Sequence, residues 1–301
     1  MKTSTSLTVL IKWRTLKRCS NITFFKQIVK RIVPKYTILS FIILSPVRLY
    51  GAFDDHIPSA QKAACASAIT AVSMGAESMY TNPAAMFHQN SFHAVTSYTK
   101  PFNLKEINMG TVTACYSSEK YAFGTGIYYF GNQLYYENQL AAGGQISLSP
   151  AIRVGGTLRY ARLSIQQYGD SGTLIGDLGA LVHFSDHITW GIVVKNANSA
   201  HIGKSKEPLP HVLATGLAFH VIESLQLTLD IAKESRFPLD ACSSLEYKLT
   251  RLLALRCGVG SHPARFTAGF GINISRIKID YAFRTHNDLG FTHLFSVHFS
   301  K

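Results

Sequence analysis

The sequence has few charged residues. They make up 16 % of its 301 residues, whereas hydrophobic residues make up 47 %. Soluble domains average roughly 25 % charged residues, so the shortage argues against a disordered chain and against the surface of an ordinary cytosolic enzyme. The formal net charge of +13 would favour nucleic acid or an anionic membrane as a partner, depending on where the charge lies.

Acidic residues are absent from positions 1–52, and this absence accounts for most of the net charge. The segment holds ten basic residues: Lys2, Lys12, Arg14, Lys17, Arg18, Lys26, Lys30, Arg31, Lys35 and Arg48. The other 249 residues carry 20 basic and 17 acidic side chains, a net charge of +3. The body of the chain is therefore nearly neutral, and we expect no nucleic-acid partner.

Residues 26–52 have the order of a secretory signal peptide. Basic residues precede an apolar run at 36–44, and small residues at 51–52 come before the acidic pair Asp54 and Asp55. The run is too short for a transmembrane helix, which needs about 20 residues. We predict a leader at 1–52 that is cleaved on export. The alternatives are an uncleaved interfacial anchor and a true start downstream of residues 1–25, which would then be a gene-model extension.

Motifs for catalysis or metal binding are also missing. The body of the chain has four cysteines without C-x-x-C spacing: Cys65, Cys115, Cys242 and Cys257. The sequence leaves open whether they are paired or free. Among the scattered histidines, His183 and His187 have a four-residue spacing, but they flank a predicted turn rather than a helix face. We expect neither an enzyme nor a bound metal or cofactor.

No apolar run of 18 residues follows the leader, and the body instead alternates apolar and polar residues with a period of two. In residues 276–284, Ile277 and Ile279 share one face, whereas Lys278 and Asp280 share the other. Fourteen segments follow this pattern: 92–99, 106–116, 120–130, 137–148, 151–164, 172–184, 187–196, 211–221, 224–232, 240–248, 252–260, 264–273, 276–284 and 291–299. We predict an all-β, antiparallel transmembrane β-barrel of about 14 strands over residues 91–301.

A soluble β-sandwich would alternate in the same way, but two features favour the barrel. Short connections at 149–150 and 185–186 alternate with longer ones at 131–136, 166–171 and 197–210, which is typical of outer-membrane barrels. Aromatic residues lie near the ends of the apolar faces, as barrel girdles do: Tyr121, Tyr129, Phe219, Tyr247, Phe283, Phe291 and Phe299. We therefore expect outer-membrane lipid around the barrel.

Residues 53–90 lack this alternation and are predicted to form a plug under the barrel mouth or inside its lumen. They contain an alanine-rich stretch and then residues 71–86, with Ser78 followed by the tripeptide Asn82-Pro83-Ala84. Through these residues, and through a tail at 279–296, the sequence resembles the FadL-like superfamily of fatty-acid transporters, particularly its PorV/PorQ-like branch. The resemblance implies an N-terminal luminal hatch ahead of a 14-stranded barrel in the bacterial outer membrane.

The resemblance also implies passive uptake of small hydrophobic or amphipathic molecules past the plug. The alternatives are a PorV-like scaffold that holds secreted cargo proteins at the outer surface, and a structural barrel without transport. The chain departs from the family in the alanine-rich start of the hatch. It also lacks a long loop that could form a surface lipid groove; residues 197–210 are its one sizeable connection.

Particular roles are predicted for four groups of residues. The amide of Asn82 would satisfy backbone groups of the plug while Pro83, which would stop any helix, fixes the following bend. The apolar face of the last strand, with Phe295, Val297 and Phe299, resembles the signal that barrel-assembly machinery reads. Charges on the polar faces would line the lumen, either paired or selecting a solute: Arg153, Arg159, Asp177, Asp230, Glu246, Lys248, Arg256, Lys278 and Asp280. The glycine pairs at 143–144 and 155–156 would lie beside a bulge or the plug.

Overall fold

A computed structural model describes residues 52–53, 59–87 and 91–301. The predicted signal peptide and the gene-model extension lie outside the described residues, apart from Ala52, and they remain predictions. Within the described part of the chain, no helix is long and apolar enough to cross a membrane.

Fourteen antiparallel strands close into a single barrel in which β1 pairs with β16. The barrel strands are β1 (Phe92–Lys100), β2 (Asn108–Ser117), β3 (Tyr121–Gly131), β4 (Tyr135–Ser147), β5 (Ile152–Ile165), β6 (Gly169–Ser185), β7 (Ile188–Lys195), β10 (Val212–Ile222), β11 (Leu225–Glu234), β12 (Asp240–Lys248), β13 (Leu253–Ser261), β14 (Ala264–Ile274), β15 (Ile277–His286) and β16 (Gly290–Ser300). All fourteen predicted segments are therefore confirmed as strands. Closure pairs every strand on both sides, so the sheet has no free edge.

The connections alternate in length less than predicted. At the end of the barrel where β1 begins and β16 ends, turns such as 186–187 and 223–224 hold two residues. At the opposite end, 196–211 is long, but the predicted loops at 131–136 and 166–171 shrink to 132–134 and 166–168 because β4, β5 and β6 extend further than expected. We call these the short-turn end and the long-loop end, which correspond to the periplasmic and extracellular ends of outer-membrane barrels.

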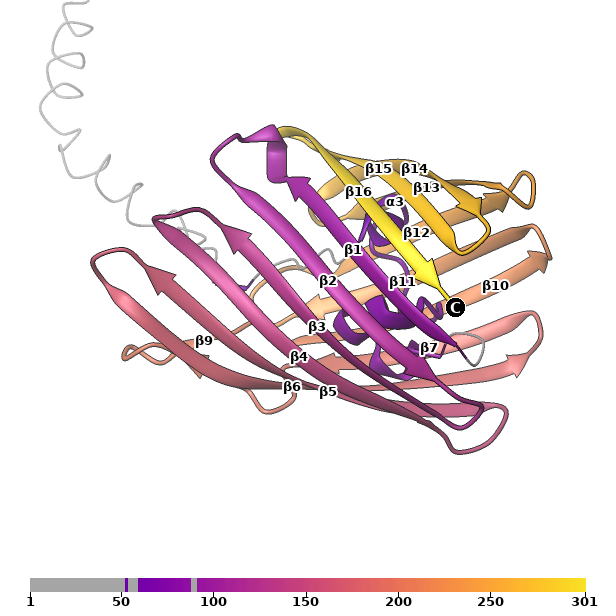
Figure 1. Cartoon of the computed structure of the whole chain (residues 1–301), viewed down its shortest axis with the longest axis horizontal. Helices are drawn as coiled ribbons and strands as arrows, with labels where there is room; N and C mark the ends of the chain where they lie inside the picture. The colour runs from indigo at the N-terminus through magenta and orange to yellow at the C-terminus, as the bar shows by residue number, and fades with distance from the viewer. Residues whose placement is uncertain (1–51, 54–58, 88–90) are drawn as a thin grey trace, which may run out of the picture. The chain divides into compact units, whose positions relative to one another are not determined.

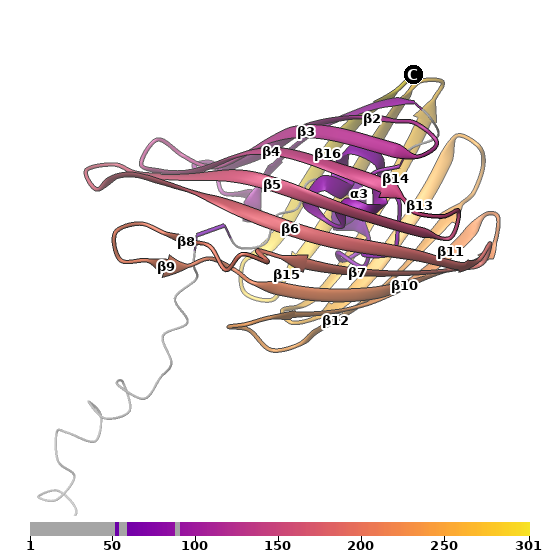
Figure 2. The ribbon, with the colours of Figure 1, turned by 90° about the horizontal axis from the view of Figure 1, so that it is seen from below.

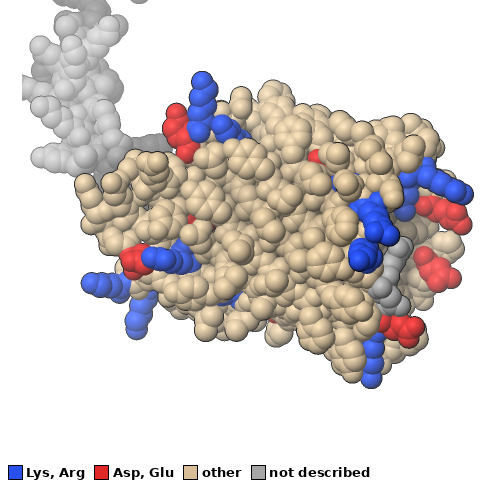
Figure 3. Space-filling model, in the orientation of Figure 1, with Lys and Arg blue, Asp and Glu red and all other residues tan. Residues whose placement is uncertain are grey.

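The two faces of the wall differ in polarity. Large apolar side chains on the outer face are exposed, as with Val112, Phe123 and Leu140, whereas alternate residues such as Thr113 and Gln139 are buried inside. In the view of Figure 3, charged residues gather at the two ends of the barrel and leave a largely uncharged band between them. The predicted girdle residues lie on this outer face, with Tyr121 43 % and Phe291 57 % exposed. An apolar outer band is what a bilayer requires of a closed barrel.

The hatch, residues 59–87, occupies the inside of the barrel (Figures 1 and 2). It contains the helix α3 (Ala60–Ala64) and two 3₁₀ helices, η1 (Gly75–Tyr80) and η2 (Pro83–Ala85). The small residues of α3 pack against β13–β16, while η1 and η2 contact β1–β6. Ala60, Ala64 and Ala84 are fully buried, because side chains of this size let hatch and wall backbones approach closely.

Two short elements lie at the long-loop end of the barrel. The 3₁₀ helix η3 (Pro101–Asn103) follows β1, and β8 (His201–Ile202) pairs with β9 (Glu207–Pro208) inside the loop 196–211. The β8–β9 hairpin was not predicted. Asn196 holds this loop, since its side-chain amide donates to the carbonyl of Leu209 at 3.1 Å and accepts from Ala200 N–H at 2.7 Å.

The four body cysteines are free thiols. Cys257 is exposed and the other three are buried. Burial raises the pKa of the Cys65 thiol, in the hatch, to about 11, so this side chain is a neutral packing group. Among the described residues, no group of three or more His, Cys, Asp and Glu side chains is placed to hold a metal ion.

Candidate functional site

Asn82 joins the hatch to the wall. Its side-chain Nδ2 donates to the carbonyl of Thr70 at 2.8 Å, within the hatch, and to that of Ala180 on β6 at 3.2 Å. Its Oδ1 accepts from the N–H of Ala84 at 3.1 Å and so caps η2. The amide therefore satisfies hatch backbone groups and also a wall carbonyl.

Pro83 begins a 3₁₀ helix, so the prediction that it would stop a helix is incomplete. The preceding helix η1 has already ended at Tyr80, and Pro83 occupies the first turn of η2, where its missing N–H costs nothing. The fixed φ of proline turns the chain directly towards the wall.

Where this segment packs against the wall, the strands carry glycine and present their backbone to the hatch. A Cβ atom built on Gly155 of β5 would lie 2.5 Å from the carbonyl carbon of Pro83, and one on Gly179 of β6 would overlap Oδ1 of Asn82. Gly191 of β7 meets the backbone of Thr70 in the same way. The prediction that the glycines at 155–156 lie beside the plug is confirmed for Gly155. We call β4–β7 the glycine half of the wall.

The outer surface of the glycine half carries a groove between exposed side chains such as Leu158 and Leu178. Ala142, Gly144, Gly156 and Gly176 line a shallow outer groove of about 710 Å³. On the inner face, Gly143 and Gly155 touch the hatch residues Met79 and Pro83. At these glycines the strand backbone itself lies against the hatch on the inside and against the groove on the outside.

The opposite wall, β11–β16, grips the hatch with charged and polar side chains, and we call it the charged half. Arg256 on β13 bonds Oε2 of Glu246 at 2.6 Å and Oδ1 of Asp280 at 2.7 Å. The Oδ2 atom of Asp280 also lies 2.7 Å from Nε2 of His298 and 3.1 Å from Nζ of Lys278. All these strands place polar residues inward, so a five-residue ionic network forms within the lumen.

This network and its neighbours reach α3 and the residues that flank it. Lys278 donates to the side chain of Gln61, and Ser296 Oγ accepts from the N–H of Ala60 at 2.6 Å. Thr267 Oγ1 donates to the carbonyl of Ala64 at 2.7 Å. The hydrogen-bonding groups of this part of the hatch are thus satisfied by wall side chains.

Glu77 of η1 is a buried carboxyl group beside the network. It is fully buried, and its Oε1 atom lies 3.7 Å from Nε2 of His298. Burial raises the pKa of Glu77, with smaller opposing effects from His298 and Lys278. Glu77 therefore favours its neutral form more than an exposed glutamate would.

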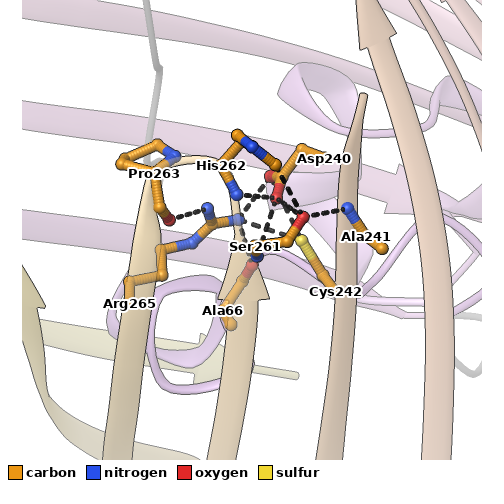
Figure 4. A network of polar contacts seen from close by, with 8 residues as sticks. All are labelled: Ala66, Asp240, Ala241, Cys242, Ser261, His262, Pro263 and Arg265. Carbon is orange, nitrogen blue, oxygen red and sulfur yellow. Dashed lines mark hydrogen bonds and ion pairs between the residues drawn. The ribbon is translucent and has the colours of Figure 1, made fainter. Parts of the chain in front are cut away.

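Arg265 provides a second anchor, nearer the long-loop end (Figure 4). Its Nη2 atom donates to the carbonyl of Ala66 at 2.9 Å and to Oδ2 of Asp240 at 2.7 Å. Asp240 is itself fixed, since its Oδ1 atom accepts from the N–H groups of Ser261 at 3.1 Å and His262 at 2.9 Å. Arg265, which binds Ala66, is thus held by Asp240, and Asp240 is held by the strand next to it, so this hatch contact is well fixed.

The lumen also has an apolar region at the long-loop end. Phe53 is 5 % exposed and packs with Ala161 of β5 and Ile175 of β6. Ile202 and Leu209, from the loop 196–211, complete the cluster. The cluster is buried, and it is separate from the apolar cluster in which hatch residues pack against Met109 and Tyr128.

The remaining predicted site residues lie as follows. Ser78 Oγ accepts from the N–H of Met74 at 3.1 Å, within the hatch. Asp230 is buried on β11 and accepts from the N–H of Thr70 at 2.8 Å. Arg159 pairs with Asp177 at 2.8 Å. The last strand carries its predicted apolar residues on the outer face: Phe295, Val297 and Phe299. Their role in barrel assembly stays a prediction.

Three contributors were missed in the sequence: His298, Arg265 and Gly179. The alternation of β16 puts His298 on the face opposite Phe299, so the inward side chain could have been identified. Arg265 is likewise the inward neighbour of Phe266 on β14. The role of Gly179 could not be predicted from β6 alone, because a side chain is excluded there by Asn82 of the hatch, which is distant in the sequence.

Fold and site together define a membrane-type barrel closed by an internal hatch. No protein-family model and no curated protein matches the sequence. Several solved structures match the fold. They include the toluene transporter TbuX from Ralstonia pickettii, at 11 % identity and a TM-score of 0.59 over 81 % of this chain and 97 % of that one.

Two further structures from Pseudomonas agree. The toluene transporter TodX of Pseudomonas putida matches at 11 % identity and a TM-score of 0.60, over 83 % of this chain and 98 % of that one. A FadL homologue of Pseudomonas aeruginosa matches at 11 % identity and a TM-score of 0.57, over 82 % and 98 %. The chain therefore has the fold of FadL-like outer-membrane channels, as the resemblance implied.

Proposed function

We propose that this protein is an outer-membrane channel for passive uptake of small hydrophobic or amphipathic molecules. The observation that carries the proposal is the apolar cluster at the long-loop end, above a hatch that fills the lumen. Ion-conducting porins have polar interiors, whereas Ile175, Ile202 and Leu209 form a buried apolar cluster that would become an apolar surface for a solute if the loop 196–211 moved. The shared fold with proteins described as toluene transporters agrees with a solute of this kind.

Passage requires the hatch to move. Asn82, Ala84 and Ala85 are fully buried between hatch and wall, so a solute cannot pass beside them in the present arrangement. The glycine half holds the hatch with fewer side-chain contacts than the charged half, although Lys195 of β7 donates to the carbonyl of Tyr80 at 2.8 Å. We propose that the hatch separates from the glycine half while the charged half keeps it in the barrel.

Uptake by bacterial cells with an intact outer membrane tests the proposal. Cells that produce the chain should take up toluene faster than cells with the empty vector, with no gain for a hydrophilic sugar of larger size. Equal toluene uptake in both strains would contradict transport. If, in addition, a secreted protein co-purified with the chain through its extracellular loops, the scaffold function would replace the transport function.

A further inference from the structure

One inward-facing arginine differs from the others in its partners. Arg159, Arg256 and Arg265 each pair with a carboxylate, at 2.8, 2.6 and 2.7 Å. Arg153, the second residue of β5, lies at the short-turn end of the same inner wall. Among the described residues, no carboxylate lies within ion-pair distance of Arg153.

The side chain of Arg153 lies on an aromatic ring instead. Its guanidinium carbon is 4.6 Å from the ring centroid of Phe87, the last described residue of the hatch. Phe87 is held by its N–H, which donates to Oε1 of Gln145 at 2.8 Å. Stacking on a ring face uses none of the five N–H donors of a guanidinium, so Arg153 keeps its capacity to bind an anion.

A histidine beside Arg153 has a second unused polar atom. His183, inward-facing on β6, shares a hydrogen bond between its Nδ1 atom and Oγ1 of Thr189 at 2.9 Å. Its Nε2 atom is shielded from solvent and has no hydrogen-bond partner among the described residues. Leu181 is the register partner of Arg153 across β5 and β6, so His183, two residues further along β6, lies diagonally opposite Arg153 on the inner face. His183 interacts electrostatically with Arg153 and with His220 of β10. Among the described residues, no acidic side chain forms an ion pair with any of the three.

We propose that Arg153 and His183 form a subsite that binds the carboxylate of an amphipathic solute at the short-turn end of the lumen. A guanidinium offers a carboxylate two parallel hydrogen bonds, and these are strongest where water is partly excluded. Phe87 would contact the apolar part of the same solute. The proposal rests on the transport function and gives the channel a preference for acids over neutral molecules of equal size.

Benzoate and benzyl alcohol are matched probes, since both carry one aromatic ring and only benzoate carries a carboxylate. Titration calorimetry on the purified full chain in detergent should show benzoate binding at least about tenfold more tightly. Arg153→Gln should reduce benzoate affinity to that of benzyl alcohol, and His183→Gln should reduce it several-fold. Arg162→Gln is the control, because Arg162 lies on the outer face of β5 and pairs with Asp170.

Several results would overturn the subsite. One is unchanged benzoate affinity in Arg153→Gln with heat-modifiable migration retained, and another is an equal loss in Arg162→Gln. A third is inorganic phosphate binding as tightly as benzoate, which would indicate a general anion site. If Arg153→Gln failed to fold, an unchanged benzoate affinity in His183→Gln would overturn the proposal.

Uptake separates this inference from the proposed function. In producing cells, Arg153→Gln should slow benzoate uptake and leave toluene uptake unchanged. Arg153-dependent benzoate binding in a protein that takes up no toluene would contradict the channel and support the subsite. Toluene uptake with benzoate binding independent of Arg153 would support the channel and overturn the subsite.

Discussion

The two halves of the wall hold one hatch by different means. The charged half uses directed contacts, with Asp280, Arg256 and Lys278 linked in a network that reaches Gln61. The glycine half instead lacks side chains at the contact, since Gly155 and Gly179 let the backbone of the hatch lie directly on the strands. Van der Waals contact of this kind depends on fit and carries no charge to desolvate on separation. One charged side chain of this half does reach the hatch, since Lys195 of β7 donates to the carbonyl of Tyr80 at 2.8 Å. The comparison teaches that the charged half holds the hatch mainly through side chains and the glycine half mainly through backbone contact. This difference supports the proposal that the charged half is the anchor and the glycine half the parting surface.

The largest effect is expected from breaking the anchor. Asp280→Ala would leave Arg256, Lys278 and His298 without the carboxylate that they share, and should lower the free energy of unfolding by about 3–5 kcal/mol. Urea denaturation in detergent micelles measures this change. Arg162→Gln, which removes an exposed outer-face ion pair, should cause no measurable change. Equal effects of the two substitutions would show that the network does not anchor the hatch.

The parting surface can be tested with adjacent residues on opposite faces of β5. Gly155→Val would drive a side chain into the backbone of Pro83, displacing the hatch at a cost of about 3 kcal/mol. Gly156→Val places the same side chain in the outer groove, where a Cβ atom meets nothing closer than 3.4 Å, and should change stability by less than about 0.5 kcal/mol. Protease cleavage within the hatch should increase for Gly155→Val alone. Similar cleavage of both variants would contradict the inner contact.

Asn82 is one of the polar links in the glycine half, and its loss should have a smaller effect. Asn82→Ala removes the hydrogen bonds to Thr70, Ala180 and Ala84, and should cost about 2 kcal/mol. Hydrogen exchange should quicken at the N–H of Ala84, because this group loses its hydrogen bond to the side-chain oxygen of Asn82. If exchange and permeability both matched those of the parent protein, the proposed role of Asn82 would be wrong.

The smallest effect concerns Glu77 and depends on pH. Because burial raises the pKa of Glu77, the folded state binds its proton more tightly than the unfolded state does. Stability from this group is therefore full below the ordinary pKa of glutamate and falls as pH rises through the raised value. Glu77→Gln should flatten this decline and raise the melting temperature slightly at alkaline pH. A variant less stable than the parent at every pH would instead identify Glu77 as an anionic partner of His298.

Sequence reasoning located the strands well and the contacts poorly. Period-two alternation depends on local burial, so it predicted 240–248 to the residue and put Asp280 and Arg256 on the inner face. Their pairing depends on what lies between them. They meet across β14 because Gly271 leaves room, since a Cβ atom there would lie 2.9 Å from Nη1 of Arg256. No pattern within one strand carries that information.

The hatch was predicted from resemblance rather than from periodicity. Its small residues indicated close packing, but the partners could not be predicted because they come from distant strands. Asn82 contacts Ala180, and Ala66 contacts Arg265. The β8–β9 hairpin was missed for a different reason, since two-residue strands are too short to show alternation.

A reversible crosslink across the glycine half tests most directly whether the hatch must part from it. Ala85 of η2 packs with Leu181 of β6 in one buried cluster, so cysteines at both positions could be joined by oxidation. The account predicts that cells producing Ala85→Cys/Leu181→Cys take up toluene after reduction and lose that uptake after oxidation, while either single variant is insensitive. Undiminished toluene uptake by the oxidised, fully crosslinked protein would contradict the account.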